Sequence, residues 1–382
     1  MKLGKRKTSA KSNIKERAGI DIPFLLLVLC LLGFGLVMVS SASYVSAYYK
    51  YGDSFYFIKR QAIFAVLGIG AMFFFSVFNY KWFKKKVWLI LLVALIMVIL
   101  VLIPGIGIKV NGARRWLGIG GFRIQPSELA KFAVIVFLSA YVSINHERMK
   151  RFDGLLPAVA VLGAFTFLVA IETHFSGAIL IFCVGAVMLF IGGMSIRTLI
   201  TFGALGGGGL LCFILFTDYA KVRLETWFNP FANPTDEGFQ IVQSLYAIGS
   251  GGVFGLGLGQ SRQKHLYIPE PQNDYIFSIV CEELGFVGAL VVLLLFILLI
   301  WRGYNIAFHM KDKFSMMLVA GIITRVAVQV IFNIAVVTNA FPSTGISLPF
   351  FSYGGTALLV LMAEMGIVLS VSRYSTLDRE KV

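Results

Sequence analysis

Charged side chains are scarce in this sequence, and acidic ones are the scarcest. Of 382 residues only 14% are charged, and 19 Asp and Glu stand against 34 Lys and Arg. A soluble domain carries about 25% charged residues, so the composition excludes an ordinary soluble protein. The chain is instead 58% hydrophobic, with 35 phenylalanines and 39 glycines. Glycine lets membrane helices approach closely, and we therefore expect a protein that crosses a membrane many times.

Cysteine and histidine are also few, with four of each. The cysteines lie inside apolar segments and form no CxxC pair or Cys/His cluster, which argues against a disulfide framework and a zinc site. The histidines do not have the spacing of metal ligands, so no classical metal site is expected. The N-terminus lacks the cleavage site of a signal peptide. Residues 1–21 are predicted to form a basic cytosolic tail.

Long apolar stretches make up most of the remaining chain. A bilayer core needs about 20 apolar residues per helix, and ten segments approach or exceed that length. They are residues 22–43, 61–78, 87–104, 127–144, 155–172, 175–193, 197–216, 275–300, 315–339 and 354–371. The expected fold is all-α: a polytopic integral membrane protein of about ten transmembrane helices, in one domain over residues 22–372. Residues 373–382 would be a cytosolic tail.

The distribution of basic residues orients these spans. With a cytosolic N-terminus, 21 of the 34 Lys and Arg fall on the cytosolic side and 11 on the outer side, as the positive-inside rule prefers. Both termini are then cytosolic, and the net charge of +15 needs no nucleic acid to explain it. The outer loops 105–126 and 217–274 still carry several basic residues. Positive charge on the disfavoured side suggests that these loops hold an anion.

The loop 217–274 is too long to be a plain connector. Residues 238–248 have helix-compatible apolar spacing, and we expect this helix to lie against the outer face of the membrane. The glycine-rich run 249–259 looks like a phosphate loop, but it lacks the GK[ST] ending and no strand precedes it. We interpret it as a tight turn between membrane-embedded segments.

Asp274 lies where this loop meets the next apolar span. A carboxylate at a membrane boundary is costly to desolvate and is usually kept for chemistry or ion handling. Aspartate is also a favoured N-cap, because its carboxylate accepts bonds from orphan backbone N–H groups. Both roles are open for Asp274, and they are compatible.

Four charged residues fall inside or at the start of apolar spans. Glu128 and Lys131 are three residues apart and can pair on one helix face, and Lys131 must face protein or a watery cavity. Arg325 and Glu364 each lie ten residues into their spans, near mid-bilayer at 1.5 Å per residue. We predict that these two pair. A structural role is the first expectation, and a charge pathway is the alternative.

Several strings together resemble the SEDS family (shape, elongation, division and sporulation), whose members include FtsW, RodA and SpoVE. They are residues 35–43, the NGARRWL string at 111–117, QPSE at 125–128, the glycine run at 246–259, the stretch from Pro269 to Gly285, and PSTGISLPFFSYGG at 342–355. Residues 53–55 and 59–61 look closer to the FtsW/SpoVE branch than to RodA. Three positions depart from the family pattern: Asn273, Thr344 and the Thr173-His174 turn. Site status is therefore withheld from Thr344 and His174.

The resemblance implies a peptidoglycan glycosyltransferase that polymerises lipid II into β-1,4 glycan strands at the outer face of the bacterial cytoplasmic membrane. It places the catalytic aspartate at Asp274, as the candidate base. Cationic help for the leaving diphosphate is expected from Arg114, Arg115, Arg223 and Lys264, and from Mg²⁺ or Mn²⁺ bound with that diphosphate. Glu270 would orient substrate or metal. Glu128 and Lys131 are further candidates for the substrate site.

Other functions remain open. Mid-membrane charges would also suit a flippase that carries lipid II across the bilayer, although no inverted repeat is visible. A divisome scaffold that recruits a transpeptidase is the third hypothesis, but it would not need Asp274 or basic outer loops. The expected partners are lipid II, a class B penicillin-binding protein and other divisome membrane proteins, with no nucleic acid.

Overall fold

The computed structural model describes residues 19–110, 113–119, 122–172, 174–216, 218–232, 234 and 238–375. Its elements in chain order are α1 (Ile22–Tyr51), α2 (Tyr56–Val77), α3 (Lys81–Lys85), α4 (Val87–Leu102), β1 (Gly107–Val110), β2 (Ala113–Ile119), β3 (Phe122–Ile124), α5 (Pro126–Asn145), η1 (His146–Lys150), α6 (Phe152–Ile171), α7 (Phe175–Ile191), α8 (Ile196–Phe216), α9 (Asp218–Phe228), α10 (Phe239–Ser250), α11 (Ile276–Phe308), α12 (Lys313–Val337) and α13 (Gly355–Ser372).

The helical fold class predicted from composition is confirmed, and a helix occupies each of the ten expected segments. Seven of the described helices are long and apolar enough to cross a membrane, and α4 and α7 are shorter apolar helices. The count of ten spans stays a prediction. The cytosolic placement of the tails also stays a prediction, because most of residues 1–21 and 373–382 lie outside the described part of the chain.

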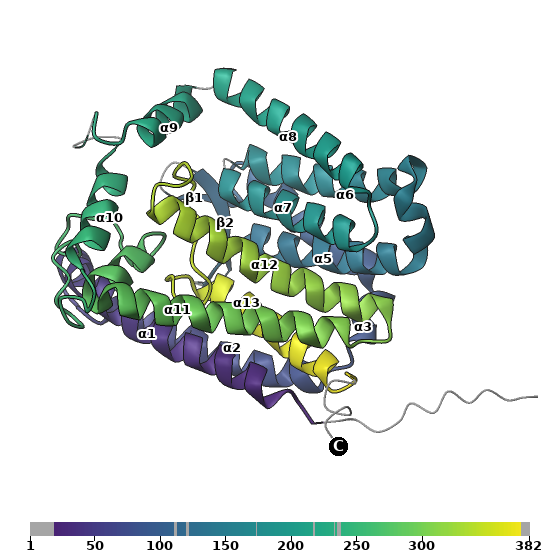
Figure 1. Cartoon of the computed structure of the whole chain (residues 1–382), viewed down its shortest axis with the longest axis horizontal. Coiled ribbons are helices and arrows are strands. Elements are labelled where there is room, and N and C mark those ends of the chain that lie inside the picture. Colours follow the sequence, from purple (N-terminus) through teal and green to yellow (C-terminus); the bar gives the residue numbers. More distant parts are fainter. Residues whose placement is uncertain are drawn as a thin grey trace, which may run out of the picture.

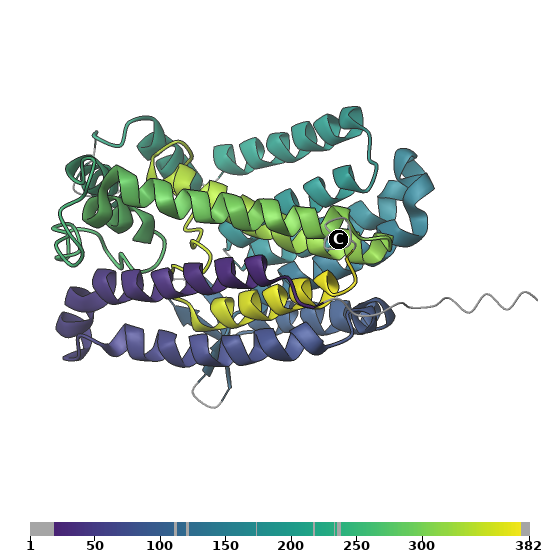
Figure 2. The ribbon, with the colours of Figure 1, turned by 60° about the horizontal axis from the view of Figure 1, so that its bottom comes forward.

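Three helices form the centre of the bundle. The apolar windows of α5, α12 and α13 are 72%, 67% and 67% buried, against 28% for α2 and α11. Figure 1 shows α12 in the middle of the molecule, with α8 at one edge. In Figure 2, α1, α2 and α13 run side by side along one flank, and α13 packs along α2 over much of its length. The charged residues Glu128, Lys131, Arg325 and Glu364 all lie on the central helices.

The segment between α4 and α5 departs from the all-α expectation. Strands β1, β2 and β3 form a three-stranded antiparallel sheet in that order. Ile108 faces Trp116, and Leu117 faces Ile124. β-branched and aromatic residues of this kind favour a pleated, half-buried surface. The strands are too short to show a clear alternation in the sequence, which is why length-based reasoning missed them.

The long loop before α11 contains α9 and α10. Helix α10 confirms the helix predicted for residues 238–248, and it packs against α11. The hydroxyl of Ser244 donates to the carbonyl of Val337 at 2.9 Å, which also joins α10 to the end of α12. The loop is therefore a folded cap on one end of the bundle, at the left of Figure 1.

Helix α11 is interrupted at Gly285, where φ is 67° and ψ is −168°. The glycine run fits into this break. The N–H groups of residues 256 and 257 donate to the carbonyls of residues 282 and 283, both at 3.0 Å. In return, the N–H groups of residues 286 and 287 donate to the carbonyls of residues 252 and 253, at 2.9 and 3.1 Å. These are the helix groups that would otherwise bond to each other, so the loop replaces the missing helical bonds. The expected tight turn is confirmed in this form.

Candidate functional site around Asp274

Asp274 lies one residue before the N-cap of α11. That N-cap is Tyr275, which makes no side-chain capping bond, and no hydrogen bond among the described residues places the Asp274 carboxylate on the first turn of α11. The capping role is therefore not supported. The main chain of Asp274 is held firmly: Asn333 Nδ2 on α12 donates to its carbonyl at 2.8 Å and to the carbonyl of Ile346 at 2.7 Å. This amide joins the aspartate to the loop that precedes α13.

The carboxylate of Asp274 lies against Gly345 in that loop. A methyl group added at Gly345 would be 3.1 Å from Asp274 Oδ2, and the glycine has φ of 71°. Such a φ is easily adopted only without a Cβ. Glycine thus lets the backbone approach the carboxylate closely while leaving Asp274 only half-buried.

The pKa of Asp274 is raised to about 6. Burial is the largest cause, because it penalises the charged form. The Arg115 and Arg223 guanidinium groups oppose this rise, and the negative charge of Glu270 adds to it. A carboxyl with this pKa is mostly ionised at neutral pH and can still accept a proton.

The two arginines reach the site from different elements. Arg115 is on β2, and Arg223 is on α9, where it donates to the carbonyl of Ser343. The Ser343 hydroxyl lies 3.3 Å from the hydroxyl of Tyr275, so the residue after Asp274 contacts the same part of the loop. The structure therefore brings two of the predicted diphosphate-binding residues to Asp274.

Arg114 does not join them. Successive residues of a strand point to opposite faces, so Arg114 points away from the side that Arg115 occupies. Its side chain packs over β1, where a methyl at Gly107 would be 2.8 Å from Arg114 Cδ. The sequence analysis predicted the same diphosphate-binding role for both arginines. In β2 their side chains point to opposite faces, so only Arg115 lies toward Asp274.

Glu270 lies at the site and is held from two sides. Its carboxylate pairs with Lys50 of α1 at 3.3 Å and accepts a bond from Asn273 Nδ2 at 2.9 Å. Asn273, noted above as a departure from the family pattern, thus fixes a carboxylate beside Asp274. This arrangement is consistent with the orienting role expected for Glu270.

Lys264 is placed differently from the prediction. Its ammonium group is buried and bonds to Glu283 at 2.8 Å, to the Gly259 carbonyl at 2.6 Å and to the Ser41 hydroxyl at 3.2 Å. An ammonium group has three donors, so these partners use all of them. Lys264 stabilises the contact of residues 251–265, here called the glycine loop, with α1 and α11. It does not face Asp274.

Glu128 and Lys131 belong to a buried network in the centre of the bundle. They pair with each other at 2.6 Å, and Arg325 binds Glu128 Oε2 at 2.5 Å. Arg325 also binds Glu364, which confirms the predicted pair. The additional contact from Glu128 was not foreseen. Two carboxylates and two cations make a balanced set, which fits the structural role and brings neither Glu128 nor Lys131 directly to Asp274.

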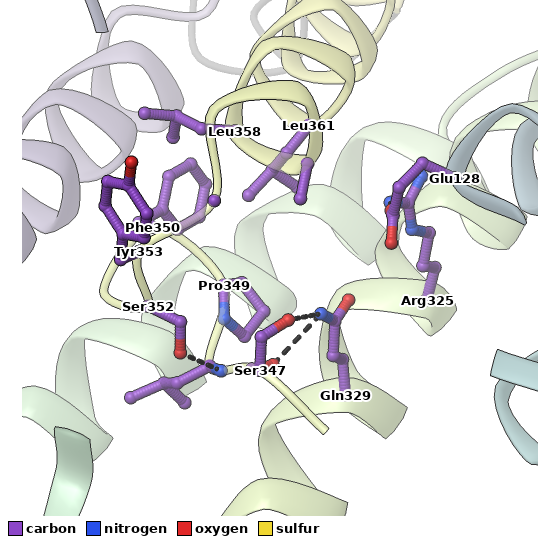
Figure 3. A pocket seen from close by; sticks show the side chains of 13 residues that line it. Glu128, Arg325, Gln329, Ser347, Pro349, Phe350, Ser352, Tyr353, Leu358 and Leu361 are labelled. Atoms are coloured by element: carbon purple, nitrogen blue, oxygen red, sulfur yellow. Dashed lines mark hydrogen bonds and ion pairs between the residues drawn. The ribbon is translucent and has the colours of Figure 1, made fainter. Parts of the chain in front are cut away.

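A small cavity of about 30 Å³ lies beside this network and below the loop before α13. Figure 3 shows Glu128 and Arg325 on one side, with Gln329 pointing toward Ser347. Gln329 Nε2 donates to the Ser347 carbonyl and hydroxyl at 3.0 and 3.1 Å. A volume of this size holds one or two water molecules, so it is not a substrate pocket.

Glu172 and His174, which were not predicted as site residues, lie near Arg115. The pKa of Glu172 is raised to about 8 by burial, although Arg115 opposes the rise. The pKa of His174 is lowered to about 3 by burial first, then by Arg115 and Lys131. The only sequence signal was their position in a short polar turn between two apolar spans.

Comparisons with known proteins agree with this fold. The family model of cell cycle proteins that covers FtsW, RodA and SpoVE matches residues 22–377. The stage V sporulation protein E of Bacillus subtilis is 44% identical over 365 residues, covering 94% of this chain and 99% of that protein. A Geobacter sulfurreducens protein named "Probable peptidoglycan glycosyltransferase FtsW" is 40% identical over 362 residues, covering 94% and 97%.

Solved structures match as well. A chain from a peptidoglycan synthase complex that coordinates polymerization and crosslinking superposes with a TM-score of 0.77 and 26% identity, covering 93% of this chain and 98% of that one. The rod shape determining protein RodA of Thermus thermophilus gives a TM-score of 0.69 at 25% identity, covering 93% and 97%. With its apolar helices, the chain is a multi-pass membrane protein, and it belongs to the FtsW/RodA/SpoVE family of cell cycle proteins.

Proposed function

We propose that this protein is a peptidoglycan glycosyltransferase that polymerises lipid II into β-1,4 glycan strands at the outer face of the cytoplasmic membrane. The observation that supports it most is the half-buried Asp274 carboxyl, with a pKa of about 6, between Arg115 and Arg223. General bases work best when their pKa lies near the operating pH. The relatives named FtsW and stage V sporulation protein E favour wall synthesis in division or sporulation.

The chemistry needs one proton acceptor. The acceptor is the 4-hydroxyl of a GlcNAc, a poor nucleophile until its proton is removed. As the hydroxyl oxygen bonds to the anomeric carbon of the donor MurNAc, its proton passes to an Asp274 carboxylate oxygen. The bond from that carbon to the diphosphate breaks, and polyprenyl diphosphate leaves with the electron pair. One displacement inverts the α-linked donor to a β-linked product, through a transition state like that of glycoside hydrolysis.

The arginines would stabilise the leaving group. Negative charge grows on the diphosphate as the bond breaks, and guanidinium groups bind phosphate oxygens in a bidentate manner. Arg115 and Arg223 approach from β2 and α9, so they would hold the diphosphate from two sides. Asp274 would remain accessible between them.

A divalent cation fits beside the proposed base. Mg²⁺ is usually bound by one or two carboxylates together with substrate phosphates, and Glu270 would supply one carboxylate, which leaves Asp274 free to accept the proton. Within the described residues no group of three or more His, Cys, Asp or Glu could hold a metal, so the diphosphate would have to complete the site. The bound cation would supply Lewis-acid stabilisation of the leaving oxygen.

A class B penicillin-binding protein is the proposed partner. The match to a chain from a peptidoglycan synthase complex that couples polymerization and crosslinking supports it. Glycan strands need crosslinking to form a wall, which a transpeptidase partner would supply.

The test is polymerisation of purified lipid II in proteoliposomes by wild type and by Asp274→Asn. Each protein is assayed with and without the transpeptidase partner, and with Mg²⁺ or EDTA. Asp53→Asn is the matched control, because Asp53 is an exposed aspartate paired with Lys59 at 2.8 Å. We expect polymer from wild type and Asp53→Asn, and a loss of about 10²–10⁴-fold for Asp274→Asn.

The other outcomes separate the alternatives. Equal polymer from Asp274→Asn and wild type would mean that the base lies elsewhere. No polymer from any form, with partner and metal present, while lipid II still crosses the bilayer, would favour the flippase. In the network of Glu128, Lys131, Arg325 and Glu364 every residue has an ion-pair partner. This favours the polymerase, since a transporter would need these charges to change partners.

A further inference from the structure

A groove of about 480 Å³ opens between α1 and the glycine loop, and it shares no lining residue with the small cavity of Figure 3. Its lining includes Val37, Ser41 and Tyr44 of α1, and Leu258, Gly259 and Lys264 of the loop. The volume lies in the range of about 300–1,000 Å³ that holds small ligands. Asp274, Arg115 and Arg223 do not line it.

Exposed apolar groups border this groove. Val37 is 49% exposed on an apolar helix long enough to span a bilayer, and Leu258 is 54% exposed in the facing loop. The same loop exposes Phe254 at 82%. Two of its N–H groups, at residues 256 and 257, are satisfied by the α11 break and would not be left unpaired in a bilayer. In a bilayer, such a groove would open sideways toward the hydrocarbon.

Lys264, the one lysine or arginine in the groove lining, is already neutralised. Lys264 is salt-bridged to Glu283, and its remaining donors bind Ser41 and the Gly259 carbonyl. The groove thus offers a hydrocarbon chain an apolar wall and offers a charged headgroup little attraction. Its chemistry fits the chain of a lipid rather than its phosphates.

Helix α1 connects the groove to the Asp274 loop. Beyond the groove residues, Ser46 lies 3.5 Å from Gln272, and Lys50 pairs with Glu270 at 3.3 Å. At a rise of 1.5 Å per residue, the step from Ser41 to Lys50 is about 14 Å. A lipid whose chain filled the groove would therefore carry its head group toward Glu270 and Asp274.

We infer that this groove binds the polyprenyl chain of the lipid-linked sugar substrate. The inference rests on the proposed function, because it takes Asp274 as the place where the sugar diphosphate reacts. The α1 face at Val37 and Tyr44, together with Leu258 of the glycine loop, then selects lipid-linked sugars by the length of their chain.

Filling the groove tests this directly. Val37→Trp places an indole in the groove, and Leu26→Trp is the control, since Leu26 is a 55% exposed residue of the same helix outside the groove lining. Lipid II with its full chain and an analogue with a shortened chain are assayed with both variants. For Val37→Trp we expect KM for full-length lipid II to rise about ten-fold with kcat little changed, which marks lost ground-state binding. The short-chain analogue should be used as by wild type.

If Val37→Trp and Leu26→Trp behave alike on both substrates, the inference is overturned. A second measurement does not require turnover. A benzophenone amino acid at position 258 should crosslink to radiolabelled lipid II more than one at position 26, and free polyprenyl diphosphate should compete. Equal competition by phosphatidylglycerol would show a groove for bulk lipid and would also overturn the inference. A wild type that crosslinks but makes no polymer would contradict the proposed function alone.

Discussion

Asn333 on α12 donates a hydrogen bond of 2.8 Å to the main-chain carbonyl of Asp274, and the same nitrogen donates to Ile346 at 2.7 Å. A helix from the centre of the bundle thus sets the position of the proposed base. The aspartate is neither on a free loop nor part of a regular helix. Asn333 holds the main chain of this residue and leaves its carboxylate to other partners.

Replacing Asn333 should therefore impair the reaction without removing the base. Asn333→Ala removes both bonds and leaves two buried carbonyls with one partner fewer, at a cost of about 1–3 kcal/mol each in the worst case. We expect polymerisation to fall at least ten-fold, with the acid limb of the pH profile unchanged. Asn145→Ala is the control, since Asn145 bonds only within its own helix end, to Tyr141. A variant as active as this control would show that the clamp is not needed.

The rate should depend on pH through the Asp274 carboxyl. A base must be deprotonated to act, so kcat/KM should rise as pH increases through about 6 and level off above it. Glu270→Gln removes a negative charge that raises this pKa, so the acid limb should move to lower pH. Glu147→Gln, at an exposed position on η1, should leave it in place. A shift to higher pH in Glu270→Gln would contradict this electrostatic arrangement.

Breaking the central network should destabilise the fold. Glu364→Gln leaves Arg325 paired with Glu128 alone, and removal of one member of a buried pair costs about 3–5 kcal/mol. We expect a cost near the lower end, because Glu128 remains at 2.5 Å from Arg325. The measurement is thermal unfolding in detergent. Neutralising both residues, in Glu364→Gln with Arg325→Met, should recover part of the loss, and a Glu364→Gln protein as stable as wild type would show that the pair contributes little.

The contact of the glycine loop with α11 should not tolerate a methyl group. At Gly255 a Cβ would lie 2.2 Å from the Glu283 carbonyl, on a backbone with φ of 79°. Gly255→Ala must therefore displace the loop or the helix, and we expect a loss of stability above about 1 kcal/mol. Gly70→Ala has nothing within 4 Å of the added methyl and should be neutral or stabilising, since alanine favours helix by about 1 kcal/mol. Thermal unfolding of the two variants compares them, and similar melting temperatures would refute the tight fit.

The sequence predicted those features that depend on the residues of one continuous segment. The helices follow from the lengths of apolar runs, and Arg325 and Glu364 were paired because residue counting places both at the same depth. The third partner was missed, since Glu128 lies at the start of α5 and only the packing of α5 on α12 brings it to Arg325.

The site residues show the same limit. Arg114 and Arg115 are adjacent in sequence, and only the recognition of β2 as a strand would have separated them. Lys264 looked like a free outer cation, but the break at Gly285 brings Glu283 to it. The approach of Arg223, Glu172 and Gly345 to this region depends on contacts between segments far apart in the chain, which no local pattern encodes.

The exchange of hydrogen bonds at the α11 break also fixes the number of residues in the glycine loop between its accepting and donating groups. Residues 252 and 253 accept from α11, and residues 256 and 257 donate to it, so the intervening chain must span one set distance. Inserting or deleting a single residue there would put two carbonyls and two N–H groups of the helix out of register at once. Residues 229–232, by contrast, lie in a turn outside that exchange. Changes of loop length should therefore be tolerated before α10 and not after it.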